Sequence, residues 1–75
     1  MKLELFVEKF AEQFDDTHVE EFSTGTVFKD LDEWSSLTAL SIIAMVDEEL
    51  EKRITGADIR NSSTIEELYH LAKSK

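Results

Sequence analysis

Two adjacent serines, Ser35 and Ser36, stand between a tryptophan and the first leucine of an apolar run in the segment EWSSLTAL, residues 33–40. The residue before a helix favours a short side-chain oxygen, which accepts backbone N–H bonds and contributes about 1 kcal/mol. If Ser35 is this cap, Ser36 is the first helical residue and its hydroxyl is free toward solvent. A phosphodiester on Ser36 would then lie beside unpaired N–H groups at the positive end of the helix dipole. The alternative assignment, in which Ser36 is the cap and Ser35 only precedes it, stays open at this point.

The other polar side chains form no recognisable catalytic set. His18 and His70 are the two candidate general bases near neutral pH, and they lie in separate segments without a nucleophile–base–orienter arrangement. A surface position is expected for each. Because no base stands next to Ser36, this serine suits modification by another enzyme rather than self-activation. We therefore expect that the chain catalyses no reaction on its own.

Neighbouring acidic residues raise the question of metal or glycosidase chemistry, but solvated acidic faces are far commoner in a chain of this composition. The segment DLDEWSSLTALS begins like a calcium-binding loop, with Asp30 and Asp32. It lacks the glycine at the sixth position, and Ser41 stands where the bidentate glutamate is needed. With only two glycines, the chain has no glycine-rich phosphate loop either. We expect no metal site.

Composition indicates the size of the domain and the class of partner. The 75 residues, 41% of them hydrophobic, predict a single domain over residues 1–75 with one modest core. The net charge of -9 argues against binding to nucleic acid or anionic membranes, and favours partners with basic patches. The absence of cysteine excludes disulfides and thiol nucleophiles. The N-terminal segment has neither a signal-peptide nor a membrane-span pattern, so a cytoplasmic location is expected. The chain is also expected to be a monomer.

Hydrophobic periodicity predicts helices and no strand. Apolar residues from Leu3 to Phe14 recur at helical spacing and predict an amphipathic first helix of about three turns. The chain from Asp15 to Trp34 loses this period and predicts a long loop. Four apolar side chains are expected to hold that loop on the core: Phe22, Val27, Phe28 and Leu31. Residues 37–51 contain no glycine or proline and predict the most regular helix.

Two further helices are predicted after the long one. Thr55 precedes a short helical turn in ITGADIRNS. Thr64 and Glu67 have the spacing of a capping box, followed by Ile65, Leu68 and Leu71 or Ala72 on one face. The expected fold class is all-α: a small four-helix bundle with a long first loop and a short third helix.

The long helix has two apolar faces when its residues are placed about 100° apart. The expected core face carries Ala39, Ile42, Ile43, Val46 and Leu50. The nearly opposite face, with Ser36 at its edge, carries Leu37, Leu40, Ala44, Asp47, Glu48 and Glu51. A helix that is apolar on both sides must bury both or offer one to a partner. We expect the face beside Ser36 to dock enzymes with basic patches; the alternative is that Leu40 and Ala44 contact the long loop or the third helix.

Trp34 is expected to pack the long loop against the start of the long helix rather than to take part in chemistry. Leu5 and Met45 receive no assignment from the pattern.

The segment WSSLTALSIIAMVDEEL, preceded by FKDLDE and followed by ITGADIRNSSTIEELYHLA, resembles the acyl carrier protein family. The resemblance covers almost the whole chain, most specifically residues 28–50 and the segment STIEEL. It implies a four-helix bundle in which a serine followed by leucine opens the second helix and receives 4′-phosphopantetheine from coenzyme A. The Asp-Ser-Leu triplet of the family falls on Ser35, Ser36 and Leu37, so the resemblance implies attachment at Ser36. Ser35 replaces the usual aspartate, and can still cap the helix but lacks its negative charge.

The function that the resemblance implies is a stand-alone carrier of acyl intermediates, held as thioesters on the terminal thiol of the phosphopantetheine arm. Its partners would be a phosphopantetheinyl transferase and the acyl-transferring and synthase enzymes of fatty-acid, polyketide or related biosynthesis. The alternative function is an acidic helical protein-interaction module that has the same fold but no prosthetic group.

Overall fold

Four α-helices form the regular structure in the computed structural model, which describes residues 1–75. In chain order they are α1 (Leu3–Ala11), α2 (Ser36–Leu50), α3 (Gly56–Arg60) and α4 (Ile65–Lys73). The long connection between α1 and α2 contains two 3-10 turns, η1 (Val19–Glu21) and η2 (Phe28–Asp30). The predicted all-α fold, with a long first loop and a short third helix, is confirmed.

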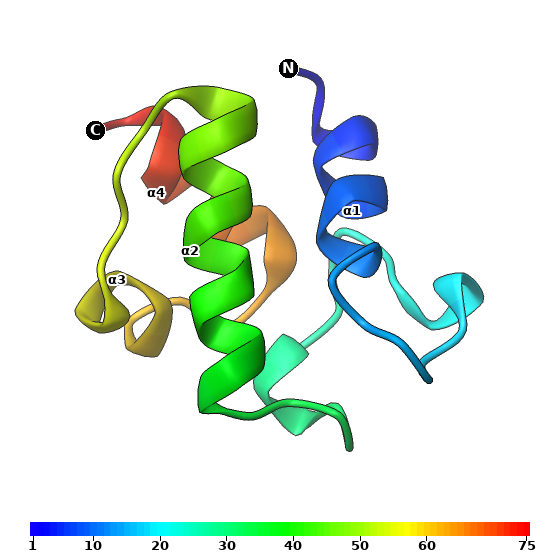
Figure 1. The fold of residues 1–75 in the computed structure, drawn as a ribbon. Coiled ribbons are helices and arrows are strands. Elements are labelled where there is room, and N and C mark those ends of the chain that lie inside the picture. The colour runs from blue at the N-terminus through cyan, green and yellow to red at the C-terminus, as the bar shows by residue number, and fades with distance from the viewer.

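The long helix α2 is the central element of the bundle. It runs antiparallel to α1 and has α3 beside its N-terminal half, as Figure 1 shows. It packs against each of the other three helices, and α4 also contacts α1 and α3. The long loop leads from the end of α1 to the start of α2, so the N-terminal turn of α2 lies beside both the loop and α3. None of the helices combines the length and the apolar character that crossing a bilayer requires.

The core receives side chains from every helix and from the long loop. Its fully buried large residues are Phe6, Phe10, Phe28, Ile42, Val46, Ile65 and Leu68. The predicted core face of α2 is confirmed at Ile42 and Val46, whereas Ala39, Ile43 and Leu50 are only partly buried. Met45, which the sequence left unassigned, is 4% exposed and belongs to the core, while Leu5 lies on the surface.

The first helix ends sooner than its apolar pattern suggests. Regular α-helix stops at Ala11, and the chain continues in tighter turns in which the N–H of Phe14 donates to the carbonyl of Ala11. These turns still bring the Phe14 ring into the core, where it stacks on Phe10 with ring centroids 5.6 Å apart. The apolar pattern therefore predicted the burial of Phe14 correctly, but the helix it predicted is about one turn longer than α1.

The long loop is fixed to the core by side chains and to α4 by its backbone. Phe22 and Phe28 are buried and Leu31 is partly buried, as predicted. The prediction for Val27 is wrong, because its side chain is 43% exposed. Val27 has an extended backbone and forms a bridge with Thr64, and neighbouring residues of an extended chain point to opposite sides. Since Phe28 points into the core, Val27 points out of it.

Thr55 precedes α3 and Thr64 opens α4 with a capping box, as predicted; the box at α3 was not predicted. Thr55 and Asp58 form a complete capping box at α3, and Thr64 and Glu67 form one at α4. Each box pairs backbone N–H groups that would otherwise lack a partner in the first turn. On α4, Ile65, Leu68 and Ala72 are fully buried, so Ala72 rather than Leu71 completes the core face.

Candidate functional site

Ser35 is the N-cap of α2, and Ser36 is the first residue of the helix. The hydroxyl of Ser35 accepts a hydrogen bond from the Thr38 N–H at 3.3 Å, and its carbonyl accepts one from the Ala39 N–H at 2.9 Å. The Thr38 hydroxyl donates to the carbonyl of Glu33 at 3.0 Å and ties the preceding loop to the same turn. The alternative, in which Ser36 is the cap, is therefore excluded by the structure.

Ser36 presents an exposed hydroxyl at the positive end of α2. None of the side-chain hydrogen bonds that fix this turn uses its oxygen. The first turn of α2 contains no acidic residue, so no carboxylate offsets the helix dipole there. The first N–H groups of a helix have no carbonyl partner within the helix, so they favour a bound anion. The position is suited to a serine that carries a phosphate ester.

Trp34 fixes the segment that leads into Ser35 and Ser36. Its indole packs on the rings of Phe14 and Phe28, with centroid separations of 6.4 and 5.0 Å. The predicted packing role of Trp34 is confirmed. Because Phe28 is fully buried, the aromatic contact anchors the start of α2 to the centre of the molecule.

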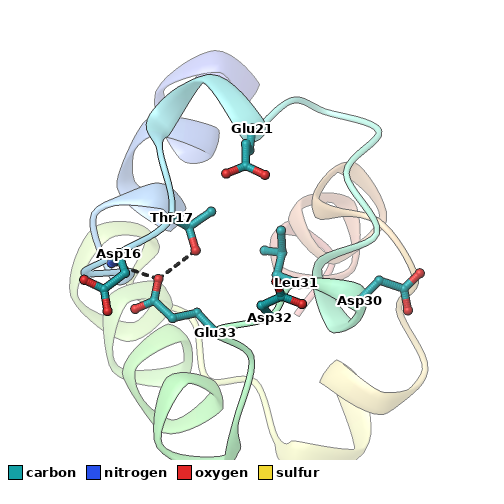
Figure 2. Close-up of a pocket in the computed structure, with 7 residues that line it drawn as sticks. All are labelled: Asp16, Thr17, Glu21, Asp30, Leu31, Asp32 and Glu33. Carbon is teal, nitrogen blue, oxygen red and sulfur yellow. Dashed lines mark hydrogen bonds between the residues drawn. The ribbon is translucent and has the colours of Figure 1, made fainter.

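Glu33 joins the end of the first helical segment to the start of α2. Its carboxylate accepts a hydrogen bond from the backbone N–H of Asp15 at 2.8 Å. It also accepts one from the N–H of Asp16 at 2.9 Å and one from the hydroxyl of Thr17 at 2.7 Å, both drawn in Figure 2. The Thr17 hydroxyl, together with these N–H groups, holds the pKa of Glu33 below its usual value of 4.5. Sequence reasoning missed this contact, because no local pattern marks a partner eighteen residues away.

An acidic hollow of about 460 Å³ lies beside Glu33. Figure 2 shows its carboxylates distributed around the opening, with that of Asp30 directed away from Glu33. The acidic residues that line it are Asp16, Glu21, Asp30, Asp32 and Glu33. Nowhere in the chain are three His, Asp or Glu side chains arranged to hold a metal ion. The hollow therefore contributes negative surface charge. The position of the Glu33 carboxylate in it is explained by the hydrogen bonds that Glu33 accepts within the loop.

The face of α2 beside Ser36 is a mixed apolar and acidic surface. Leu37 and Leu40 are 77% and 62% exposed and are the two exposed large hydrophobic residues of α2. The other predicted members of this face, Ala44, Asp47, Glu48 and Glu51, are also exposed. Leu40 and Ala44 are both exposed, so neither is buried by the long loop or α3. These six residues are called the α2 docking face below.

A shallow hollow of about 290 Å³ adjoins the α2 docking face. Leu40, Ala44 and Asp47 line it from α2, and Arg53 and Ile54 line it from the segment that follows. Ile54 is buried and forms an apolar floor. The docking face thus adjoins an apolar depression whose lining includes one carboxylate, Asp47, and one cation, Arg53.

The two histidines lie on the surface, as expected. His18 precedes the η1 turn, and His70 lies on α4 with its Nε2 atom 3.5 Å from the Glu66 carboxylate one turn earlier. Neither residue is among the side chains that surround Ser36, so neither histidine is placed to deprotonate its hydroxyl.

No protein-family model, curated protein or solved structure matches this chain. Function is therefore inferred from three features of the molecule: the free hydroxyl of Ser36, the exposed face of α2 beside it, and the all-α bundle that presents both.

The hydrogen bonds that the Glu33 carboxylate accepts should make the stability of the folded protein depend on pH. A carboxyl whose pKa is lowered by folding stabilises the protein above its unfolded pKa, and this contribution is lost as pH falls through the lower, folded pKa. We expect Glu33→Gln to melt at a lower temperature than wild type at pH 7. The difference in melting temperature should shrink below about pH 4.5. It should vanish at a pH where the Glu33 carboxyl is protonated in both the folded and the unfolded state. Thermal melts from pH 7 to pH 3, followed by circular dichroism, measure it.

Asp32→Asn is the matched control for this measurement. Asp32 is the exposed neighbour of Glu33 and lines the same hollow, but its carboxylate accepts none of the hydrogen bonds that Glu33 accepts. Removal of its charge should leave the melting temperature at pH 7 unchanged or raise it, because the chain has an excess of negative charge. Equal destabilisation by both substitutions would contradict the role given to Glu33.

Proposed function

We propose that the protein is a cytoplasmic, monomeric carrier of acyl intermediates with a 4′-phosphopantetheine arm on Ser36. The observation that carries the proposal is the free hydroxyl of Ser36 at the first position of α2, directly after a capping serine and beside an exposed apolar and acidic face. The sequence resemblance to acyl carrier proteins supports the same serine. The thiol of the arm, when attached, forms thioesters with acyl groups of fatty-acid, polyketide or related biosynthesis.

The residues at the start of α2 fit such an attachment. The Ser36 oxygen is free to attack the pantetheine-bearing phosphorus of coenzyme A. A new O–P bond forms, the pyrophosphate bond of coenzyme A breaks, adenosine 3′,5′-bisphosphate leaves, and the serine proton passes to a base of the phosphopantetheinyl transferase. Ser35 holds the helix start with a neutral side chain, so the negative charge of the phosphodiester meets no carboxylate in the first turn. The N–H groups of this turn face the new charge.

The α2 docking face supplies the second requirement of a carrier, which is repeated and brief binding to several enzymes. Exposed Leu37 and Leu40 provide a small apolar contact beside the attachment point. Asp47, Glu48 and Glu51 lie farther along the same face, toward the end of α2, and their charges speed the encounter with basic surfaces without locking the complex. The chain as a whole, with its net charge of -9, favours the same class of partner.

The test of the proposed function is covalent loading. Wild-type protein is incubated with coenzyme A and a broad-specificity phosphopantetheinyl transferase, and its intact mass is measured. We expect the addition of one phosphopantetheine per chain. A folded chain that stays unmodified with several transferases would contradict the proposal and favour the alternative, an acidic interaction module without a prosthetic group.

The α2 docking face can be tested by charge reversal. We expect Asp47→Lys with Glu48→Lys to slow association with a cognate transferase or synthase by about tenfold or more at low salt, and by less at physiological salt. Both side chains are exposed, so the helical fold should be retained. Stopped-flow or surface-plasmon measurements give the association rate. Glu4→Lys with Glu8→Lys, which changes the net charge equally on α1, is the control and should have a smaller effect.

Substitutions at Leu40 and Ile42 distinguish a residue of the contact surface from a residue of the core. Leu40→Ala should speed dissociation from the partner and leave stability nearly unchanged, because the side chain is 62% exposed. Ile42→Ala should lower the free energy of unfolding by about 2–5 kcal/mol, because that side chain is fully buried. An association rate insensitive to the charge reversals and a dissociation rate insensitive to Leu40→Ala would remove this face from partner recognition.

A further inference from the structure

A third hollow opens at Ser36, between the start of α2, the η2 turn and α3. Its volume is about 310 Å³, and it is lined by Ser35 and Ser36 from α2, Lys29 from η2 and Arg60 from α3. Trp34 and Ile59 contribute apolar walls. No carboxylate lines this hollow, although the chain has 17 acidic and only eight basic residues. The lining of this hollow is therefore positively charged, whereas the molecule as a whole is negatively charged.

The two cations are held at this hollow by contacts that do not neutralise them. The Lys29 ammonium donates to the backbone carbonyl of Arg60 at 2.8 Å, which ties η2 to the end of α3. The Nη1 atom of Arg60 lies 3.4 Å from the position a Cβ would take on Gly56, so the guanidinium lies back along α3 over its first turn. Neither residue belongs to an ion pair, because the three pairs of the structure are Lys9–Glu12, His70–Glu66 and Lys75–Asp58.

No carboxylate neutralises these two cations. Lys29 contributes to a lowered pKa of Glu67, but the main causes are the N–H groups of Ser63 and Thr64, which bind its carboxylate. The first turn of α2 has no acidic residue, and the N-cap is the neutral Ser35. The charged donors of Lys29 and Arg60 thus remain available to an anion on Ser36. Lys and Arg are the side chains that bind phosphate oxygens most strongly.

We propose that Lys29 and Arg60 form a phosphate-binding pair for the phosphodiester of the arm on Ser36. The inference rests on the proposed function and adds to it two residues that position the arm. Without them, a phosphodiester on a chain of net charge -9 would add to its self-repulsion. With them, the new negative charge lies between two cations and against the start of α2.

The test compares the effect of loading on thermal stability in three proteins: wild type, Lys29→Gln with Arg60→Gln, and a control. The control, Lys2→Gln with Lys52→Gln, removes the same charge near the chain's N-terminus and past the end of α2, at the opposite end of that helix (Figure 1). Lys52 also donates to a backbone carbonyl at 2.8 Å, so the control loses a comparable bond. Each protein is melted with and without the arm, after intact mass has established complete loading.

We expect loading to raise the melting temperature of wild type, relative to the double variant, by roughly 2–4 °C at low salt. The control should behave as wild type, and 1 M salt should remove the difference. The ³¹P resonance of the loaded arm should also differ between wild type and the double variant. Arg60→Gln alone, which keeps the bond from Lys29 to the Arg60 carbonyl, should show part of both effects.

The outcomes separate this inference from the function on which it rests. If the arm attaches but loading has the same effect on melting and the same ³¹P resonance in wild type and the double variant, the phosphate-binding pair is refuted and the carrier function stands. A chain that accepts no arm overturns the carrier function, and the phosphate-binding pair with it.

Discussion

Ser36→Ala should abolish attachment of phosphopantetheine, whereas Ser35→Ala should retain it and lower stability. The structure gives the two hydroxyls different roles: that of Ser35 accepts the Thr38 N–H bond, and that of Ser36 is exposed and free of the capping bonds. Loss of the cap should lower the free energy of unfolding by about 1 kcal/mol. For a domain of this size that corresponds to roughly 4–8 °C in melting temperature. Intact mass and thermal melts measure the two effects.

Ser35→Asp is the control for the cap. Aspartate caps helices about as well as serine, so this variant should keep wild-type stability or exceed it, and should take the arm on Ser36. Ser36→Ala should melt close to wild type because its hydroxyl is not among the capping bonds. An arm that attaches to the Ser36→Ala chain, or that is lost in a folded Ser35→Ala chain, would contradict these assignments.

Phe28→Ala should lower the free energy of unfolding by about 3–5 kcal/mol. This is a large share of the roughly 5–15 kcal/mol by which small domains are stable. Phe28 is fully buried although it lies in the long loop, and its ring packs on Phe10 and Trp34 with centroids 5.4 and 5.0 Å away. Its loss leaves a cavity at the point where the loop is joined to the start of α2. Urea unfolding followed by circular dichroism gives the value.

The neighbouring residue provides the control for Phe28. Val27 is 43% exposed and is held by its backbone bridge to Thr64, so Val27→Ala should change the free energy of unfolding by less than about 1 kcal/mol. If the two substitutions destabilised the protein equally, the loop would not be anchored as the structure shows.

Helix starts were predictable because their signals are local. Thr55, Thr64 and Ser35 each precede their helix and bond to N–H groups three residues later. Such a signal is contained within four residues of sequence, so it requires no knowledge of the tertiary fold. The same reasoning placed Ser36 at the first position of α2 as one of two alternatives, and the observed bond to Thr38 decided between them.

The orientation of α2 was predicted less well than its extent. The core arc includes Met45 with Ile42 and Val46, and leaves Ile43 only partly buried. It is rotated toward Met45 because α1 packs on that side, where Lys9 and Gln13 of the α1 region line a hollow together with Met45. Periodicity shows that a helix has two apolar faces, but the position of its neighbours decides how each is buried.

Contacts between distant segments gave no sequence signal. Glu33 bonds to residues 15–17, and Lys29 bonds to the carbonyl of Arg60, thirty-one residues away. Glu33 accepts three hydrogen bonds and Lys29 donates one, and in each case the partners are brought together by the packing of aromatic and aliphatic side chains elsewhere. The docking face was predictable because it lies on one helix, whereas the hollow with Lys29 and Arg60 requires three elements to be placed together.

The most direct test of the central claim is fragmentation mass spectrometry of the wild-type chain after loading with coenzyme A and a transferase. Cleavage between Ser35 and Ser36 produces one fragment that ends at Ser35 and one that begins at Ser36. The carrier function with attachment at Ser36 predicts that the added phosphopantetheine is found entirely on the fragment that begins at Ser36, and on peptides of it that contain residues 36–37. An arm found on Ser35 or elsewhere, or a folded chain without any arm, would contradict it.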